Sequence, residues 1–330
     1  MTTQHFNRQI IIGYLCAIGA TALWSGNFII ARGLSESISP ITLAFWRWVV
    51  AVAVFVPLAW ESLIAEWDIL TKNLPYLLLT SVLGITVFNT LLYYAGHSTT
   101  AINLSLISIT FPVFIVIFSR IFFREAITLR RGAGIIVVAF GVVFLITKGS
   151  LSTLLHLSFA IGDLWMLTAA IIFAVYSILL KNKPPGLSIW ALHLSTFMLG
   201  LLFLFPLFVW DCVTGPAVAY DPNIIGSILY VGVFASLTAF VLWSKAIVAV
   251  GPVRAGMIYY TLPLFSGFTA YLVLKEPIGI VHFFSLFLIV SGILIANSAS
   301  TKVSHRAWQG TDNQGGPETP VKQGEDNDTM

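Results

Sequence analysis

The sequence predicts an all-α integral membrane protein with ten transmembrane helices, built as two inverted five-helix repeats. The first observation is composition: the 330 residues are 58% hydrophobic and 9% charged, with a mean hydropathy of +0.91. Soluble proteins carry about 25% charged residues, so this composition indicates a membrane protein. The second observation is an offset of 151 positions that relates the two halves of the chain. It carries Pro112 onto Pro263, Arg124 onto Lys275, Glu125 onto Glu276 and Gly141 onto Gly292.

The third observation is a series of apolar segments long enough to cross the hydrocarbon, which takes roughly 20 residues of helix. They are expected, in order, near residues 10–31, 41–60, 74–95, 98–121, 132–147, 160–180, 187–210, 224–245, 252–274 and 278–297. Segment 132–147 is short, and its neighbours can lend residues to it. All are too long and too uninterrupted for the strands of an outer-membrane barrel. Because each half crosses five times, the second half must enter the bilayer upside down.

The ends and the cysteines need separate interpretations. One repeat is expected over residues 10–147 and the other over residues 160–297, followed by a disordered cytoplasmic tail at 298–330, which is polar and has almost no apolar run. The first segment is about 22 residues long and lacks a convincing cleavage site, so a retained helix is expected rather than a signal peptide. Cys16 and Cys212 fall in different predicted helices, which indicates neither a disulfide framework nor a thiol metal site.

The lysines and arginines of the loops predict the orientation. If the N-terminus lies in the cytoplasm, thirteen of these residues fall inside and three fall outside, and the loop Arg124–Arg131 anchors the bias. We therefore expect both termini to be cytoplasmic. The same topology accounts for the net charge of +3, so the charge gives no reason to expect a nucleic acid partner.

Short motifs in both halves resemble those of a known family. They are Trp24-Ser25-Gly26-Asn27-Phe28, Ala44-Phe45-Trp46-Arg47, Pro112-Val113-Phe114, Phe123-Arg124-Glu125, Phe173-Ala174-Val175-Tyr176-Ser177, Pro263-Leu264-Phe265 and Lys275-Glu276. Spaced as two copies over residues 10–297, they resemble the EamA family of the drug/metabolite transporter superfamily. The resemblance implies a carrier in a bacterial inner (plasma) membrane, for amino acids, drugs or related amphipathic metabolites, with export as the expected direction.

The repeat itself indicates a transporter, because inverted repeats typically create a substrate site at their interface, near the bilayer midplane. No GxxxxGK[ST], HExxH or GxSxG motif is present, so we expect no ATP hydrolysis, no membrane-embedded enzyme and no cofactor. Alternating access of a secondary transporter is the mechanism that remains. Two alternatives stay open: a non-transporting sensor or assembly partner, and a flippase of lipid-linked substrates with the same fold.

The candidate substrate site combines aromatic and amide side chains. Asn27, Asn89 and Asn103 fall in the first, third and fourth segments, where amides either bind other helices or face a cavity. The resemblance implies that segments one, three, six, eight and nine line that cavity, which is expected to measure about 300–1,000 Å³. The residues expected there are Trp24, Asn27, Phe28, Tyr93, Asn103, Tyr176, Trp243 and Tyr259. Core packing is the alternative for any one of the rings.

Three further predictions concern orientation, gating and structure. Arg47 lies two turns into its helix, where an unpaired cation costs at least about 2.5–3.5 kcal/mol on insertion scales. It either holds an anionic group such as a substrate carboxylate or extends outward to the headgroups. Pro112 and Pro263 fall mid-segment and are expected to kink or gate their helices. Glu125 and Glu276 each follow a helix beside a cation, which favours a structural role in capping and pairing.

Overall fold

The computed structural model describes residues 2–99, 101–274 and 279–298, and all of its regular elements are helical. The first half contains α1 (Thr2–Gly33), α2 (Pro40–Ala65), α3 (Trp67–Lys72), α4 (Leu74–Ser81), η1 (Val82–Val87), α5 (Phe88–Ser98), α6 (Ala101–Ser108), α7 (Phe111–Phe123) and α8 (Leu129–Ile146). After α9 (Leu151–Leu155), the second half contains α10 (Ile161–Lys181), α11 (Ile189–Thr214), α12 (Pro222–Tyr230), η2 (Val231–Thr238), α13 (Ala239–Val250), α14 (Pro252–Tyr259), α15 (Leu262–Leu274) and α16 (Ile280–Ser298). The tail expected at 298–330 and the predicted structural residue Glu276 lie outside the described residues, apart from Ser298 itself.

Several helices begin at the polar residues that favour helix starts. The side chains of Ser39, Thr128, Ser188 and Asp221 each accept a hydrogen bond from a backbone N–H in the first turn of α2, α8, α11 and α12. These starts, together with the apolar segments between them, account for the positions of most membrane-spanning helices. Nine helices within the described ranges are long and apolar enough to cross a membrane. The remaining predicted segment, 252–274, is divided between α14 and α15.

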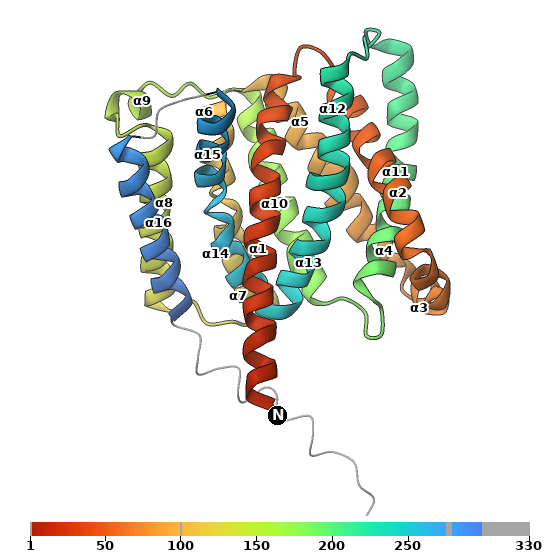
Figure 1. Cartoon of the computed structure of the whole chain (residues 1–330), viewed down its shortest axis with the longest axis horizontal. Coiled ribbons are helices and arrows are strands. Elements are labelled where there is room, and N and C mark those ends of the chain that lie inside the picture. The colour runs from red at the N-terminus through yellow and green to blue at the C-terminus, as the bar shows by residue number, and fades with distance from the viewer. Residues whose placement is uncertain (1, 100, 275–278, 299–330) are drawn as a thin grey trace, which may run out of the picture.

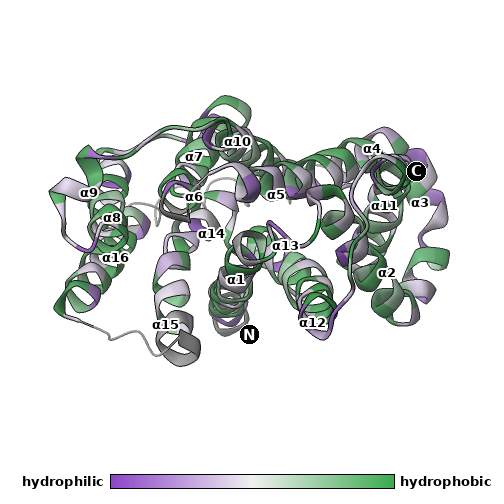
Figure 2. Cartoon of the chain, turned by 90° about the horizontal axis from the view of Figure 1, so that it is seen from above, coloured by the Kyte–Doolittle hydropathy of each residue, from purple (hydrophilic) through white to green (hydrophobic). Residues whose placement is uncertain are grey.

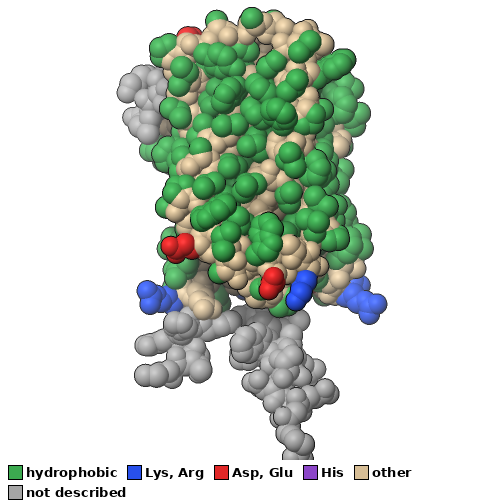
Figure 3. All heavy atoms as spheres, turned by 90° about the vertical axis from the view of Figure 1, so that its right-hand side faces the viewer, with side chains coloured by type: hydrophobic (Ala, Val, Ile, Leu, Met, Phe, Trp, Pro, Cys, Tyr) green, Lys and Arg blue, Asp and Glu red, His purple; other side chains and the backbone are tan. Residues whose placement is uncertain are grey.

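The outer wall of the bundle is apolar. Figure 3 shows hydrophobic side chains covering one whole side of the molecule, with the visible charged side chains near its two ends. The visible Lys and Arg side chains lie at the lower end, which is the end where α1 begins in Figure 1. This is the surface of a multi-pass membrane protein, because hydrocarbon replaces water around the middle of the bundle.

The two halves are interleaved rather than side by side. Seen from above in Figure 2, one layer contains α8, α7, α10, α5 and α11, and the other contains α16, α15, α1, α13 and α2. Each layer therefore draws helices from both halves. The contacts are paired accordingly: α1 packs on α13 as α10 packs on α5, while α2 packs on α11 and α8 on α16. The repeats are inverted, since α1 begins at the lower end in Figure 1 and α10 begins at the upper end.

Glycines let helices of the two halves approach closely. A Cβ atom built on Gly134 would lie 2.6 Å from the carbonyl oxygen of Gly292, and one built on Gly292 would lie 2.8 Å from the carbonyl oxygen of Gly134. Gly141 meets the side chain of Leu288 in the same way, at 2.8 Å. These contacts join α8 to α16, so the repeated glycines of the sequence mark a helix–helix contact that only small residues permit.

The two predicted mid-segment prolines lie where their spans break. Pro112 is in the first turn of α7 and Pro263 is next to the start of α15, each just after two residues that interrupt the helix. At these interruptions Thr110 Oγ1 donates to the carbonyl of Ile107 and Thr261 Oγ1 donates to the carbonyl of Ile258, both at 2.7 Å. The break, its threonine and its proline therefore repeat together at the offset of 151 positions. Each proline begins a new helix rather than bending a continuous one.

Two further irregularities occur at corresponding places. The spans 74–98 and 222–250 both change from α-helix to π-helix in their middle, over η1 and η2. In η2, the side chains of Ser236 and Thr238 donate to carbonyls five residues earlier, at 2.7 and 2.9 Å. Short π-helical stretches in α-helices are frequent at functional sites, because they displace carbonyls from their usual partners. Both stretches border the site described next.

Candidate functional site

A small enclosed cavity lies between the two layers. It is lined by Trp24, Asn27, Phe28, Arg47, Phe88, Asn89, Leu92, Phe173 and Tyr259, which come from α1, α2, α5, α10 and α14. Its volume is about 10 Å³, close to the space that one water molecule requires. The expected 300–1,000 Å³ is therefore not present in this conformation. Aromatic rings fill the space instead.

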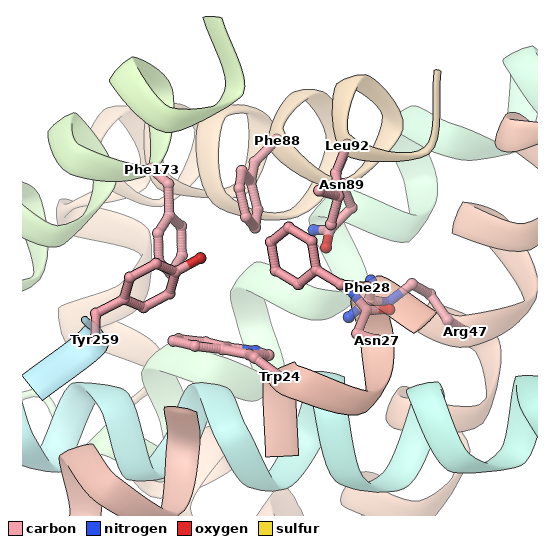
Figure 4. Close-up of a pocket in the computed structure, with 9 residues that line it drawn as sticks. All are labelled: Trp24, Asn27, Phe28, Arg47, Phe88, Asn89, Leu92, Phe173 and Tyr259. Carbon is pink, nitrogen blue, oxygen red and sulfur yellow. The ribbon is translucent and has the colours of Figure 1, made fainter. Parts of the chain in front are cut away.

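The rings form one side of the cavity, as Figure 4 shows. Trp24 meets Phe173 edge to face, with ring centroids 5.3 Å apart, and Trp243 lies behind it at the same distance. Phe173 stacks on Phe88 at 4.3 Å, and Tyr259 contacts the ring of Phe111 at 4.7 Å. These separations are those of favourable aromatic pairs. In this cluster, rings of the first half of the chain pack against rings of the second half.

Trp24 is fixed in this cluster by a hydrogen bond to η2. Its indole Nε1 donates to the carbonyl of Ala235 at 2.9 Å. Trp243 packs against Trp24 and does not itself line the cavity. It donates similarly from Nε1 to Ser177 Oγ at 3.0 Å. Both rings are at most 5% exposed, so each N–H requires such a partner. The indoles are consequently held in defined orientations.

Arg47 forms the polar side of the cavity together with Asn27 and Asn89 (Figure 4). The arginine is completely buried. Its Nε donates to Ser236 Oγ at 2.6 Å and its Nη1 donates to the hydroxyl of Tyr93 at 2.7 Å. The Tyr93 hydroxyl in turn donates to Asn27 Oδ1 at 3.0 Å. The sequence left two interpretations open, and outward extension to the headgroups is wrong, because the guanidinium turns inward to partners in two other helices, η2 and α5.

The guanidinium remains incompletely satisfied by the protein. Arg47 Nη2 has no hydrogen-bond partner, and no carboxylate among the described residues lies within 4 Å of it. The rings of Trp48 and Tyr93 lie 5.4 and 5.5 Å from its central carbon, within the range of cation–π attraction. Such contacts offset only part of the cost of burying a cation. The cavity therefore contains one full positive charge without a counter-charge from the chain.

Asn89 contributes the complementary group. Its Nδ2 donates to the carbonyls of Gly84 and Ile85 in η1, at 3.0 and 2.9 Å, whereas its Oδ1 has no hydrogen-bond partner. Buried polar atoms are usually paired, so each exception needs an explanation. Here Arg47, with its unpaired donor, and Asn89, with its unpaired acceptor, both line the same small cavity. A ligand with both an acceptor and a donor group would satisfy them.

The predicted binding residues fall into three groups. Trp24, Asn27, Phe28 and Tyr259 line the cavity. Tyr93, Tyr176 and Trp243 are buried immediately around it: Tyr93 by its bond to Arg47, and the other two by packing against Phe173. Asn103 is elsewhere, so the prediction that it lies at the cavity is wrong. Its Nδ2 donates to both carboxylate oxygens of Asp163, at 3.1 and 3.0 Å, where α6 meets the first turn of α10.

Four further residues line the cavity that were not among the predicted binding residues: Phe88, Asn89, Leu92 and Phe173. Helical spacing was the available signal. Asn89 precedes Tyr93 by one helical turn and Phe173 precedes Tyr176 by three residues, so each shares a face with a residue that was predicted. Among the described residues, no group of His, Cys, Asp or Glu is arranged to hold a metal ion.

Polar contacts close the bundle at both ends of this site. At the upper end Thr99 Oγ1 also donates to Asp163, at 2.5 Å, so residues of the first half meet the start of α10. At the lower end Glu125 pairs with Lys181 at 2.9 Å and with Arg131 at 3.8 Å. The pair Glu125–Lys181 joins the end of α7 to the end of α10, across the two halves. Helix α10 is thus held to the first half at both of its ends, by Thr99 and Asn103 at its start and by Glu125 at its end.

Together, the inverted repeats, the apolar wall and the enclosed site define a membrane transporter of small molecules. The chain belongs to the EamA-like transporter family, whose sequence profile matches residues 11–147 and 160–298. The same family was expected from the motifs of the two halves.

Individual relatives agree with this class. An uncharacterized transporter of Archaeoglobus fulgidus is 27% identical over 266 residues, covering 77% of this chain and 86% of that protein. The uncharacterized transporter YyaM of Bacillus subtilis is 23% identical, covering 86% and 93%. A riboflavin transporter of Brucella anthropi is 24% identical, covering 68% and 74%. One crystal structure covers 88% of this chain and 98% of its own with a TM-score of 0.71; at 17% identity it shows a shared fold alone.

Proposed function

We propose that this protein is a secondary transporter that exports small organic metabolites carrying a carboxylate or similar anionic group, by alternating access around the Arg47 cavity. The observation that carries the proposal is Arg47 itself: a completely buried guanidinium whose Nη2 has no hydrogen-bond partner and which has no carboxylate partner among the described residues. A planar guanidinium matches the geometry of a carboxylate, and charge-assisted hydrogen bonds are about twice as strong as neutral ones.

The two sides of the cavity support an amphipathic substrate. Arg47, Asn27 and Asn89 would hold its polar end, while Trp24 and its neighbouring rings would contact its apolar or aromatic end. Aromatic walls favour such groups through burial and stacking. The unpaired Oδ1 of Asn89 would accept a hydrogen bond from a donor next to the anionic group. This combination favours substrates that carry charge and ring within one small molecule.

Transport requires the closed cavity to widen and to open to each side in turn. The broken spans α6–α7 and α14–α15 occupy corresponding positions in the two halves, and Tyr259 ends α14 directly before one of the breaks. Helix breaks of this kind are the usual place where transporter helices meet their substrate. Pro112 and Pro263 would accordingly act at the hinges. The thirteen-to-three bias of basic residues supports cytoplasmic termini in an inner membrane.

Matched pairs of ligands test the proposal. Purified protein is screened by thermal unfolding against aromatic and aliphatic carboxylates, each beside its own primary amide, with riboflavin included as an uncharged aromatic compound. A ligand that binds the folded state raises the melting temperature. At a ligand concentration of 100 times the dissociation constant, the free energy of unfolding increases by about 2.7 kcal/mol. We expect the carboxylates to stabilise the protein more than their amides. Equal stabilisation by both members of every pair would exclude an anion-binding role for Arg47.

Transport in liposomes then separates a carrier from a binding protein. The carboxylate with the largest effect on melting temperature is radiolabelled and its uptake into proteoliposomes is measured beside protein-free liposomes. Saturable uptake that the unlabelled carboxylate inhibits, and its amide does not, is the expected result. Binding without uptake would instead favour a non-transporting sensor.

A further inference from the structure

A second cavity lies on the outside of the bundle, away from the Arg47 cavity. It is a groove of about 320 Å³ between α2 and the segment that leads into α12, and we call it the α2–α12 groove. Its lining residues are Trp46, Val50, Tyr220, Ile225, Ile228 and Leu229. None of them is charged. Its occupant must therefore be recognised by apolar contact.

The α2–α12 groove faces the lipid. Ile225 is 46% exposed and Leu229 is 50% exposed, and both belong to a span long and apolar enough to cross the membrane. In Figure 2, α2 and α12 lie next to each other at the periphery of the bundle. In a bilayer, the medium that enters an apolar groove at this position is the hydrocarbon of the surrounding lipids.

The depth of the groove corresponds to one leaflet. Trp46 and Ile228 each lie six residues after the first residue of their helices, which is about 9 Å at 1.5 Å per residue, and Val50 lies about 15 Å from the start of α2. One leaflet contributes half of the hydrocarbon thickness, also about 15 Å. The groove therefore extends from the upper membrane surface towards the bilayer midplane.

The upper rim of the groove has the amphipathic character of a membrane interface. Trp46 Nε1 donates to the hydroxyl of Tyr220 at 2.9 Å, and Tyr220 directly precedes Asp221, the N-cap of α12. Tryptophan and tyrosine are enriched at the level of lipid headgroups, where one part of the side chain is apolar and the other is hydrated. This pair marks the level at which a lipid tail would enter the groove.

We propose that the α2–α12 groove binds one acyl chain of a phospholipid from the leaflet at the upper end of the bundle. The occupant is a single chain rather than a headgroup, because the groove offers burial and no charge. A second copy of the protein fits less well, because the six lining residues are far fewer than the roughly 20–30 residues that each partner contributes to a standard protein interface. The lipid is the class of molecule that surrounds the groove and matches its chemistry.

The bound chain would lie directly behind the Arg47 cavity. A Cβ atom built on Gly232 of η2 would be 2.6 Å from the side chain of Val50 and 3.0 Å from the carbonyl oxygen of Arg47, so α2 and η2 touch at the floor of the groove. One turn beyond Gly232, Ser236 accepts the hydrogen bond from Arg47. A chain packed on Val50 and Ile228 would thus stabilise the helix contact that positions the arginine.

Native mass spectrometry of the intact protein tests this inference. Ile228→Trp fills the middle of the groove, and Leu202→Trp is a control for adding a tryptophan to the lipid-facing surface, because Leu202 is 64% exposed on α11 and does not line the groove. We expect wild type and Leu202→Trp each to retain one phospholipid in mild detergent. Ile228→Trp should retain at least about ten-fold less, since loss of contact with two methylene groups corresponds to that factor. Equal retention in all three proteins would overturn the proposal.

A measurement on wild type keeps the test valid if Ile228→Trp folds poorly. The protein is reconstituted in phosphatidylethanolamine vesicles containing a phospholipid with a photoreactive group in its acyl chain. We expect cross-links concentrated in the segments 46–50 and 220–229. Cross-links spread evenly over all lipid-facing helices would overturn the site. Replacing phosphatidylethanolamine by phosphatidylglycerol should leave the labelling unchanged, and a strong dependence on the headgroup would contradict recognition through the chain.

Discussion

Replacing Arg47 by methionine separates the contribution of this residue to stability from its contribution to binding. Methionine keeps an unbranched apolar stem of similar reach and removes the charge. Burying an arginine within a span costs about 2.5–3.5 kcal/mol on insertion scales, and the substitution removes this cost. It also removes the hydrogen bonds that Arg47 donates to Ser236 and Tyr93. The net effect on stability depends on whether those two hydroxyls lose their only partner.

Neither the Ser236 hydroxyl nor the Tyr93 hydroxyl loses its only hydrogen-bond partner. Ser236 Oγ also donates to the carbonyl of Val231 at 2.7 Å, and the Tyr93 hydroxyl also donates to Asn27 Oδ1 at 3.0 Å. Both protons therefore stay paired in Arg47→Met, so most of the usual penalty of about 1–3 kcal/mol for an orphaned group is avoided. We expect the variant to unfold at the same temperature as wild type or higher.

The effect on binding has the opposite sign. A hydrogen bond to a charged group contributes about 1.5–3 kcal/mol, which corresponds to roughly 10- to 150-fold in affinity. Arg47→Met should lose that factor for a carboxylate ligand and bind the matching amide as wild type does. Arg47→Lys, which keeps the charge and loses the planar fork, should be intermediate.

The assay is calorimetric or fluorescence titration of the purified variants with one carboxylate and its amide, beside thermal unfolding without ligand. A variant with unchanged carboxylate affinity would refute the role of Arg47 in binding. A large drop in melting temperature, with both ligands weakened equally, would show that the arginine holds the fold together instead. Gains in stability at the expense of activity are typical of residues kept for function.

Three other expectations are tested by simpler measurements. Glu125→Gln should lower stability by only about 0.2–1 kcal/mol, because its ion pair is partly exposed, and a variant that loses pH-dependent transport while folding normally would show a coupling role. Gly292→Ala should destabilise the protein by about 1–3 kcal/mol in thermal unfolding, because its Cβ would meet backbone atoms of α8 at 2.8 Å. Gly226→Ala is the neutral control, because a Cβ at Gly226 would have nothing within 4 Å. Equal effects of the two substitutions would contradict the close contact. Reporter fusions after Ser150 should be periplasmic and fusions after Lys183 cytoplasmic, and the reverse pattern would contradict the proposed orientation.

Most of the fold was predictable, because the apolar segments and their repetition can both be recognised in the sequence without knowing which helices become neighbours. Hydropathy places the spans, and the offset of 151 positions relates Pro112 to Pro263 and Gly141 to Gly292. The structure adds what these residues do: the prolines follow helix breaks, and the glycines lie where α8 meets α16. Such roles depend on which helices become neighbours, and hydropathy contains no information about that choice.

The site was predictable only in part, for the same reason. Trp24, Asn27 and Phe28 share one face of a single helix, so their common orientation could be inferred from spacing. The direction of Arg47 could not, because Ser236 lies 189 residues further along the chain. Asn103 was misplaced because an amide in a membrane segment binds whatever polar group is near, and here Asp163 is nearer than the cavity. The small cavity volume reflects one closed arrangement of the rings, which composition does not encode.

The separation between Arg47 and Ser236 also has a consequence for biosynthesis. Ribosomes add about 5–20 residues per second, so the 189 residues between them take roughly 10–40 s to make. Throughout that time the newly made second span contains an arginine whose partner in η2 does not yet exist. Until η2 is made, Arg47 can bond only to Tyr93 of its own half, so the second span enters the bilayer with its guanidinium less fully paired than in the finished protein. We expect nascent chains truncated before residue 236 to be extracted or degraded more readily than chains extended past it.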